Sequence, residues 1–163
     1  MNQEEIDARI ALSKKKYQAR KAEQIEKINI RKAGIKFINE NNIKIYNSHI
    51  GMSDLTIGFW REDGIYLVAY TVKSKKDKFS VKKAKGLIGN RLSSADTRTK
   101  EGMVTYIERP KKLSSDSDFG LYCINKICQM AIENPEATNS YTLTREVQNF
   151  YSDSLYCLIL TEI

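Results

Sequence analysis

The segment Gly64–Val72, with the sequence GIYLVAYTV, constrains the fold more than any other part of the chain. It is rich in β-branched and aromatic residues, which is typical of a β-strand. Leu67 and Ala69 would lie on one side of this strand, and Val68 and Tyr70 on the other. Because both sides are apolar, we expect a central strand that is covered on both faces of its sheet.

The neighbouring segments predict the partners of this strand. Strand-forming residues also fill 43–48 and 54–61, and Glu62-Asp63-Gly64 predicts a hairpin turn before the central strand. We expect a further strand over 102–109, ended by Pro110, and a final strand over 154–163. Helices are predicted over 81–92, capped by Ser80, and over about 118–134, ended by Pro135. The first helix would turn one apolar face to the core and project lysines to solvent: Val81, Ala84, Leu87 or Ile88, and Leu92 on the apolar face, and Lys82, Lys83 and Lys85 towards solvent. Residues 142–151 are ambiguous and favour a short helix.

Residues 3–33 contain neither proline nor glycine and are rich in strong helix formers. We expect one long helix or two here. Its apolar residues are too widely spaced for a thick core stripe, so it either docks weakly or orders only with a partner. The chain is therefore predicted to be an α+β protein, with a small antiparallel sheet, packed helices and a basic helical N-terminal arm. This N-terminal arm covers residues 1–34, and a single α+β domain covers 35–163.

The composition narrows the class of protein. A chain of 163 residues with 41% hydrophobic and 29% charged residues is ordinary for a globular domain with a real core. The three cysteines, Cys123, Cys128 and Cys157, lie in apolar segments and are interpreted as buried thiols in a reducing compartment. The first residues carry no signal-peptide pattern, and no segment resembles a membrane span. We expect a soluble, cytoplasmic protein that does not bind membranes.

Charge is distributed unevenly along the chain. Residues 73–112 contain thirteen Lys or Arg and four Asp or Glu, whereas residues 113–163 contain two and seven. Such polarity predicts a face that meets phosphates or an acidic protein surface, although a solvated lysine surface is the plain alternative. The residues predicted to bind form the lysine cluster, together with four residues of the N-terminal arm: Lys73, Lys75, Lys76, Lys78, Lys82, Lys83, Lys85 and Arg91, with Lys14, Lys15, Lys16 and Arg20.

This lysine cluster could hold DNA or RNA by charge alone, without reading a sequence. The aromatic residues Trp60, Tyr66, Tyr70 and Phe79 flank it and could stack on bases. For Tyr66 and Tyr70, a place in the core or on the strand surface is the better interpretation. No signature of a sequence-specific nucleic-acid-binding module is present.

Several kinds of chemistry lack the residues that they need. His49 is the only histidine, so neither a zinc-type ligand set nor a Ser–His–Asp arrangement has support, and His49 is expected in a loop or at a strand end. Gly86 and Gly89 form a GxxG, the spacing that clamps a nucleic-acid backbone in KH domains. Leu87 and Ile88 between them favour the core, so we expect the glycines to permit close approach to the sheet. No catalytic residue, metal or cofactor is predicted.

One stretch resembles the PD-(D/E)xK nuclease core. Asp54 opens one strand and Lys73 closes the next, as in that family, whose two carboxylates hold a divalent metal beside a lysine. Thr71 stands where the second carboxylate belongs. The resemblance therefore implies either a degenerate core or, as the alternative site, a nuclease that uses Asp54 and Lys73.

The basic run from Lys75 to Gly86, followed by Asn90-Arg91-Leu92, resembles segments of small early proteins of bacteriophages. The layout of residues 1–92 is also similar to that of some phage anti-CRISPR proteins. This resemblance implies a phage or mobile-element protein that binds and inhibits a host RNA-guided CRISPR nuclease with its guide RNA, in the host cytoplasm. The alternatives are a phage DNA- or RNA-binding accessory protein and the degenerate nuclease.

Overall fold

The computed structural model describes residues 1–62, 65–73, 78–94, 104–138, 143–148 and 160–163. The N-terminal helix α1 (Gln3–Glu40) precedes three consecutive strands, β1 (Ile45–Ile50), β2 (Ser53–Glu62) and β3 (Ile65–Lys73). The helix α2 (Val81–Ser93) leads to β4 (Val104–Ile107) and to the helix α4 (Asp116–Glu133). A 3-10 turn, η2 (Pro135–Thr138), a short helix over 143–148 and the strand β5 (Thr161–Glu162) complete the chain. The α+β class is confirmed.

The five strands form one sheet in the order β4-β3-β2-β1-β5, and every described pair is antiparallel. β3 pairs with β2 and β4, and its residues alternate between two cores, as its sequence predicts. Leu67 and Ala69 lie in one core, while Val68 and Tyr70 lie in the other. All four are fully buried, so the prediction of a central strand covered on both faces is confirmed.

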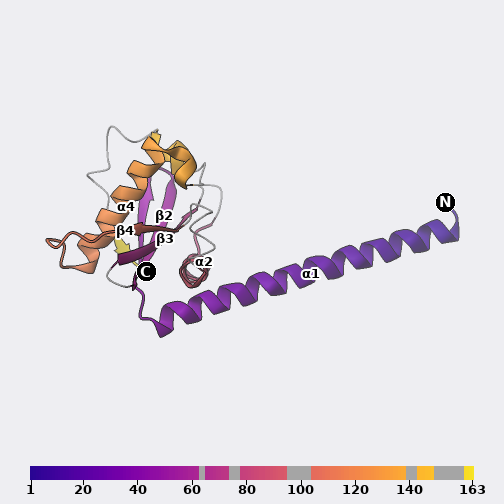
Figure 1. Cartoon of the computed structure of the whole chain (residues 1–163). Helices are drawn as coiled ribbons and strands as arrows, with labels where there is room; N and C mark the ends of the chain where they lie inside the picture. The colour runs from indigo at the N-terminus through magenta and orange to yellow at the C-terminus, as the bar shows by residue number, and fades with distance from the viewer. Residues whose placement is uncertain (63–64, 74–77, 95–103, 139–142, 149–159) are drawn as a thin grey trace.

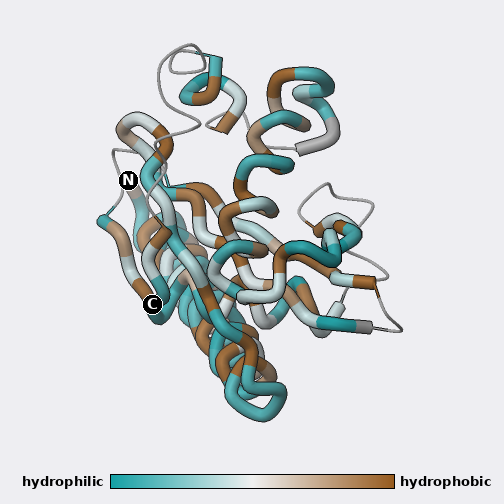
Figure 2. Tube along the Cα trace, turned by 90° about the vertical axis from the view of Figure 1, so that its left-hand side faces the viewer, coloured by the Kyte–Doolittle hydropathy of each residue, from teal (hydrophilic) through white to brown (hydrophobic). Residues whose placement is uncertain are grey.

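The molecule has three layers, with α4 on one side of the sheet and α2 on the other (Figure 1). The α4 face holds the larger core, in which Phe119, Ile124 and Ile127 of α4 pack against β2 and β3. The short helix over 143–148 adds Leu143 and Val147 to it. Hydrophobic residues, brown in Figure 2, recur along the strands and along α4. Burial of this apolar surface is the main driving force for the fold.

The predicted helix boundaries agree closely with the structure because their capping residues are local signals. Ser80 caps α2 and accepts a hydrogen bond from the backbone N–H of Lys83, and Ser115 caps α4 in the same way. α4 ends just before Pro135. Ala84, Ile88 and Leu92 of α2 face the core as expected, but the expected core position of Val81 is wrong, since this residue is 40% exposed.

α1 is one continuous helix of 38 residues, about 57 Å long at the normal rise per residue. A capping box between Asn2 and Glu5 begins it. Every side chain from residue 1 to 30 is exposed, including Ile10 and Tyr17, and this part projects from the body as a lone rod (Figure 1). Only its end packs on the domain, where Gly34 and Ile38 are buried.

α1 and α2 cross at three glycines. A Cβ atom on Gly89 would lie 1.9 Å from the carbonyl oxygen of Gly34, and one on Gly34 would lie 2.1 Å from that of Gly86. The two backbones are therefore in direct contact, which only glycine permits. The expectation that Gly86 and Gly89 allow close approach to the sheet is wrong, because the partner that they approach is α1.

Several predicted features lie wholly or partly outside the described residues, the buried thiol of Cys157 among them. The turn residues Asp63 and Gly64 are not described, although the pairing of Glu62 with Ile65 brings the strand ends together. Of the predicted final strand over 154–163, residues 160–163 belong to the described part, and Thr161–Glu162 forms the strand β5 that pairs with β1.

Candidate functional site

One end of the sheet carries two rows of polar side chains on the face that α2 covers. His49, Asp54 and Lys73 are directly opposite one another across β1, β2 and β3. In the next row, Asn47, Thr56 and Thr71 are opposite one another in the same way. We call these six residues the polar end of the sheet. Such an arrangement needs a specific register, because a shift of one residue would turn every member to the other face.

Asp54 is the centre of the polar end of the sheet. Its Oδ1 atom lies 2.7 Å from Nδ1 of His49 and accepts from Nδ2 of Asn47 at 3.2 Å, while its Oδ2 lies 3.3 Å from Nζ of Lys73. Asp54 is only 6% exposed, so these partners compensate for the cost of burying its charge. The hydroxyl of Thr56 donates to Oδ1 of Asn47 at 2.9 Å and extends the network into the second row.

A cavity of about 130 Å³ lies between the polar end of the sheet and the start of α2. Val72, Phe79, Ala84 and Leu87 form its apolar lining. Its polar lining comes from both strands and from the start of α2 and consists of Thr56, Thr71, Lys73, Lys78, Ser80 and Lys83. Three lysines in one small cavity make it suited to a negatively charged group. We call it the lysine-lined cavity.

The structure divides the predicted lysine cluster into residues with different surroundings. Lys78, Lys82 and Lys83 are exposed around the start of α2, whereas Lys85 is half-buried, so its predicted projection into solvent is only partial. Lys73 pairs with Asp54. Lys75 and Lys76 lie outside the described residues.

Arg91 and the basic residues of the N-terminal arm do not join this surface. The half-buried Arg91 donates from its guanidinium to the backbone carbonyl of Tyr70. Lys14, Lys15, Lys16 and Arg20 are exposed on the part of α1 that projects from the body (Figure 1). The predicted binding residues thus lie on two separate surfaces.

The aromatic residues that flank the lysine cluster are mostly part of the core. Tyr70 is fully buried, and this burial, opposed by the nearby charge of Arg91, raises the pKa of its phenol to about 12. Tyr66 packs edge-on against Phe119, with ring centroids 4.7 Å apart. Trp60 packs edge-on against Phe37 of α1. Phe79, which lines the cavity, is the aromatic residue of this group nearest to the exposed lysines.

The residues of the nuclease-like pattern meet, but without a metal-binding set. Asp54 and Lys73 are partners in register on adjacent strands, as the pattern predicts, and they also form an ion pair. Thr71, in the place of the second carboxylate, offers a hydroxyl in the neighbouring row. Among the described residues, no group of three or more His, Cys, Asp or Glu side chains is placed to hold a metal ion.

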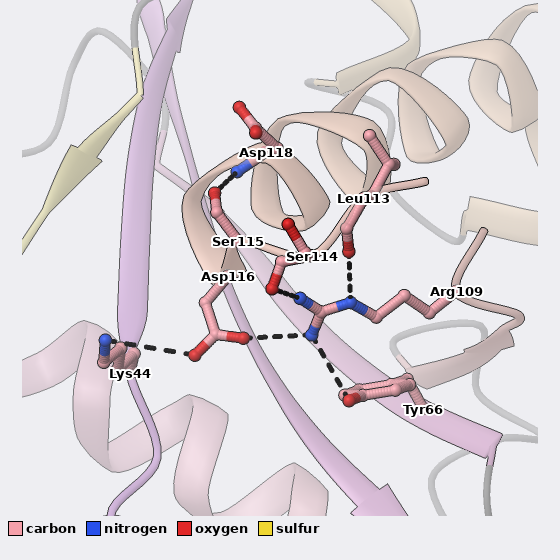
Figure 3. A network of polar contacts seen from close by, with 8 residues as sticks. All are labelled: Lys44, Tyr66, Arg109, Leu113, Ser114, Ser115, Asp116 and Asp118. Carbon is pink, nitrogen blue, oxygen red and sulfur yellow. Dashed lines mark hydrogen bonds and ion pairs between the residues drawn. The ribbon is translucent and has the colours of Figure 1, made fainter. Parts of the chain in front are cut away.

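Sequence reasoning missed Arg109, whose guanidinium forms a network of hydrogen bonds on the α4 side (Figure 3). Its guanidinium donates to the backbone carbonyls of Leu113 and Ser114, at 2.7 and 2.6 Å, and to Asp116 at 2.9 Å. It also donates to the hydroxyl of Tyr66 at 3.3 Å. All three of its nitrogen atoms are engaged within the protein, so Arg109 fixes the connection from β4 to α4. Two of its partners are backbone carbonyl groups, which every residue has, so no residue type in the sequence indicates this contact.

Comparison of the chain with protein-family models, with curated proteins and with solved structures finds no match. In the part of the chain that the structure describes, no helix is both long enough and apolar enough to span a bilayer.

Proposed function

We propose that this protein binds a nucleic acid or a nucleoprotein through the exposed lysines at the start of α2. The observation that carries the proposal is the position of Lys78, Lys82 and Lys83, which are exposed around the start of α2, where Lys78 and Lys83 line the lysine-lined cavity. Among the described residues none of the three forms an ion pair, so their charge is available to a partner. Each lysine that neutralises a phosphate releases counterions, which favours binding without reading a sequence.

The N-terminal arm supplies a second basic surface. Lys14, Lys15 and Lys16 are consecutive and therefore point in different directions around the helix, at about 100° from one to the next. A partner that lies against one side of the arm meets only some of them. The arm thus adds affinity to the contact at α2 rather than forming a binding site of its own.

A direct test measures the affinity of the full chain for a fluorescent single-stranded and a double-stranded oligonucleotide as salt is varied. The triple variant Lys78→Glu, Lys82→Glu and Lys83→Glu is compared with the matched variant Lys111→Glu and Lys112→Glu, whose exposed lysines lie in the loop before α4. The first variant should bind at least tenfold more weakly, with a shallower salt dependence, because about 0.9 counterion is released per phosphate contact. Absence of binding at low salt, or equal losses in both variants, would overturn the proposal.

A more specific form of the proposal is an inhibitor of a guide-loaded CRISPR nuclease, acting in the cytoplasm of a bacterial host. Its support is the resemblance of residues 1–92 to phage proteins and the basic surface at α2. Co-elution with a guide-loaded effector and loss of target cleavage would support it. Unchanged cleavage at an excess of the protein would leave only the accessory nucleic-acid-binding function.

A metal-dependent nuclease is the second candidate, because Asp54 and Lys73 meet in register at the polar end of the sheet. This candidate predicts magnesium-dependent nicking of DNA or RNA that Asp54→Asn abolishes. Nicking that persists in that variant would come from a contaminant, and absence of nicking in the unaltered protein would reject the candidate.

A further inference from the structure

We propose that the lysine-lined cavity binds the terminal phosphate of a nucleic-acid strand, as a phosphomonoester. This inference rests on the proposed function, because it names the group that the surface at α2 recognises most strongly. Binding of internal phosphates by exposed lysines requires no cavity. A concave site with charge and hydroxyl groups from several segments is suited to one defined group.

The charges around the cavity favour an anion with more than one negative charge. Lys73, Lys78 and Lys83 line it from the end of β3, the following segment and the first turn of α2. Asp54 pairs with Lys73 and balances one of these charges. Among the lining residues that the structure describes, Lys78 and Lys83 then contribute the net positive charge. A phosphomonoester carries between one and two negative charges at neutral pH and matches it, whereas a phosphodiester carries one.

The hydroxyl groups that line the cavity differ in whether they can donate a hydrogen bond to a ligand. Oγ of Ser80 accepts from the backbone N–H of Lys83 at 3.3 Å, which leaves the proton of Ser80 for a ligand. The hydroxyl of Thr56 already donates its one hydrogen bond to Oδ1 of Asn47, so it cannot donate to a ligand. Thr71 lies beside Thr56 in register and is half-buried, so its hydroxyl can donate from the side of the sheet. Ser80 and Thr71 therefore supply neutral donors from opposite sides of the cavity.

Size and shape favour the end of a strand over its interior. The volume of about 130 Å³ is close to that of an engineered cavity of about 150 Å³ that holds benzene, so it suits the five heavy atoms of a phosphate but not a whole nucleotide. On one side the cavity is closed by the paired strands β2 and β3. A continuous strand cannot pass through the sheet, whereas a terminal phosphate can reach Thr71 without a chain continuing beyond it.

The test uses the full chain and three forms of one single-stranded oligonucleotide, with a 5′-phosphate, a 3′-phosphate or hydroxyl groups at both ends. Anisotropy at low salt should show about tenfold tighter binding of a phosphorylated form, as expected for added charge-assisted hydrogen bonds. Thr71→Val, which keeps the shape of the side chain, should remove most of this preference while leaving the affinity for the hydroxyl form unchanged. Thr105→Val is the matched control, because Thr105 is a half-buried threonine of β4 outside the cavity.

The outcomes separate this inference from the proposed function. Equal binding of all three forms, with the salt dependence retained, would overturn the phosphate site and leave the proposed function standing. No binding of any form would overturn both. A preference for a terminal phosphate that survives Thr71→Val would place its recognition elsewhere and reject this cavity. Circular dichroism of each variant verifies that it is folded.

Discussion

The two faces of the sheet differ in the polarity of the residues that cover them. The α4 face is mainly an apolar layer in which Phe119 contacts Phe59, Tyr66 and Tyr122, and Arg109 stacks on Tyr66 and Phe119. The α2 face is apolar at one end, around Ile88 and Leu92, and polar at the other. We infer that stability is concentrated on the α4 face. The α2 face combines a smaller core with the polar end of the sheet and the exposed lysines of the proposed binding surface.

The largest expected effect is a loss of stability of the α4 face at alkaline pH. Burial raises the pKa of Cys123, of Cys128 and of Tyr70 to about 12, and all three residues belong to the core under α4. Each pKa in the folded state lies above its value in the unfolded state. The contribution of these three groups to the free energy of unfolding is therefore fully present below about pH 8.5 and is lost as the pH rises towards 12. Because three groups act together, we expect the free energy of unfolding to fall steeply over this range.

Urea denaturation at a series of pH values measures this fall. The double variant Cys123→Ala and Cys128→Ala should be less stable at pH 7 but should lose less of its remaining stability as the pH rises. A free energy of unfolding that stays constant from pH 8.5 to 11.5 would show that these side chains can ionise without disturbing the core.

Truncation of one aromatic residue should have the next largest effect. Phe119→Ala removes a fully buried ring from the centre of the α4 face and should cost about 3–5 kcal/mol of the free energy of unfolding. Tyr106→Ala on β4, where the side chain is 53% exposed, is the control and should change it by less than about 0.5 kcal/mol. Similar losses in the two variants would contradict the concentration of stability under α4.

A pair of glycine variants compares the helix packing on the two faces. Gly89→Ala in α2 forces a Cβ atom into the backbone of Gly34 and should cost about 1–3 kcal/mol, against the usual gain for alanine in a helix. Gly120→Ala in α4 would place its Cβ 3.1 Å from a side-chain atom of Leu160 and 3.2 Å from the ring of Tyr46, contacts with side chains that a shift of a few tenths of an ångström relieves. Its effect should be close to zero. Denaturation measures the free energy of unfolding of both variants, and limited proteolysis measures how well α1 stays docked. Equal values for Gly89→Ala and Gly120→Ala would show that the crossing of α1 and α2 can relax.

The smallest of these effects concerns the polar end of the sheet. Asp54→Asn leaves the shape intact but removes the charge that holds Lys73 and His49, which should cost about 1–2 kcal/mol. Asp118→Asn, at an exposed position in the first turn of α4, serves as control. If Asp54→Asn were neutral or stabilising, the network would exist for binding rather than for the fold.

The local signals in the sequence predicted most of the fold. Ser80 and Ser115 act through bonds to N–H groups three residues away, and the alternation in β3 reflects burial at each successive position. The α1–α2 crossing was not predictable, because Gly34 and Gly89 are distant in the sequence and their contact depends on how two helices meet. The expected place of Val81 in the core is wrong for a related reason, since its burial also depends on tertiary packing, which leaves this first residue of α2 40% exposed while Ala84 is buried.

The candidate site was predictable only in part. The sequence singled out Asp54, Lys73 and the exposed lysines of α2 as separate segments. The two rows that join Asp54 to His49 and Thr71 to Thr56 depend on strand register, which no short pattern specifies. The split between the lysines at α2 and those of the N-terminal arm depends on how far the single helix α1 extends, and the sequence allowed either one helix or two.

The rigid continuity of α1 sets a minimum footprint for any partner. The 14 residues from Arg20, the nearest of the four basic arm residues, to Gly34 at the crossing with α2 span about 21 Å along the helix axis. At 3.4 Å per base pair this corresponds to about six base pairs of B-form DNA. A duplex shorter than this can therefore reach only one of the two basic surfaces, and affinity should rise in a step once the duplex is long enough to reach both.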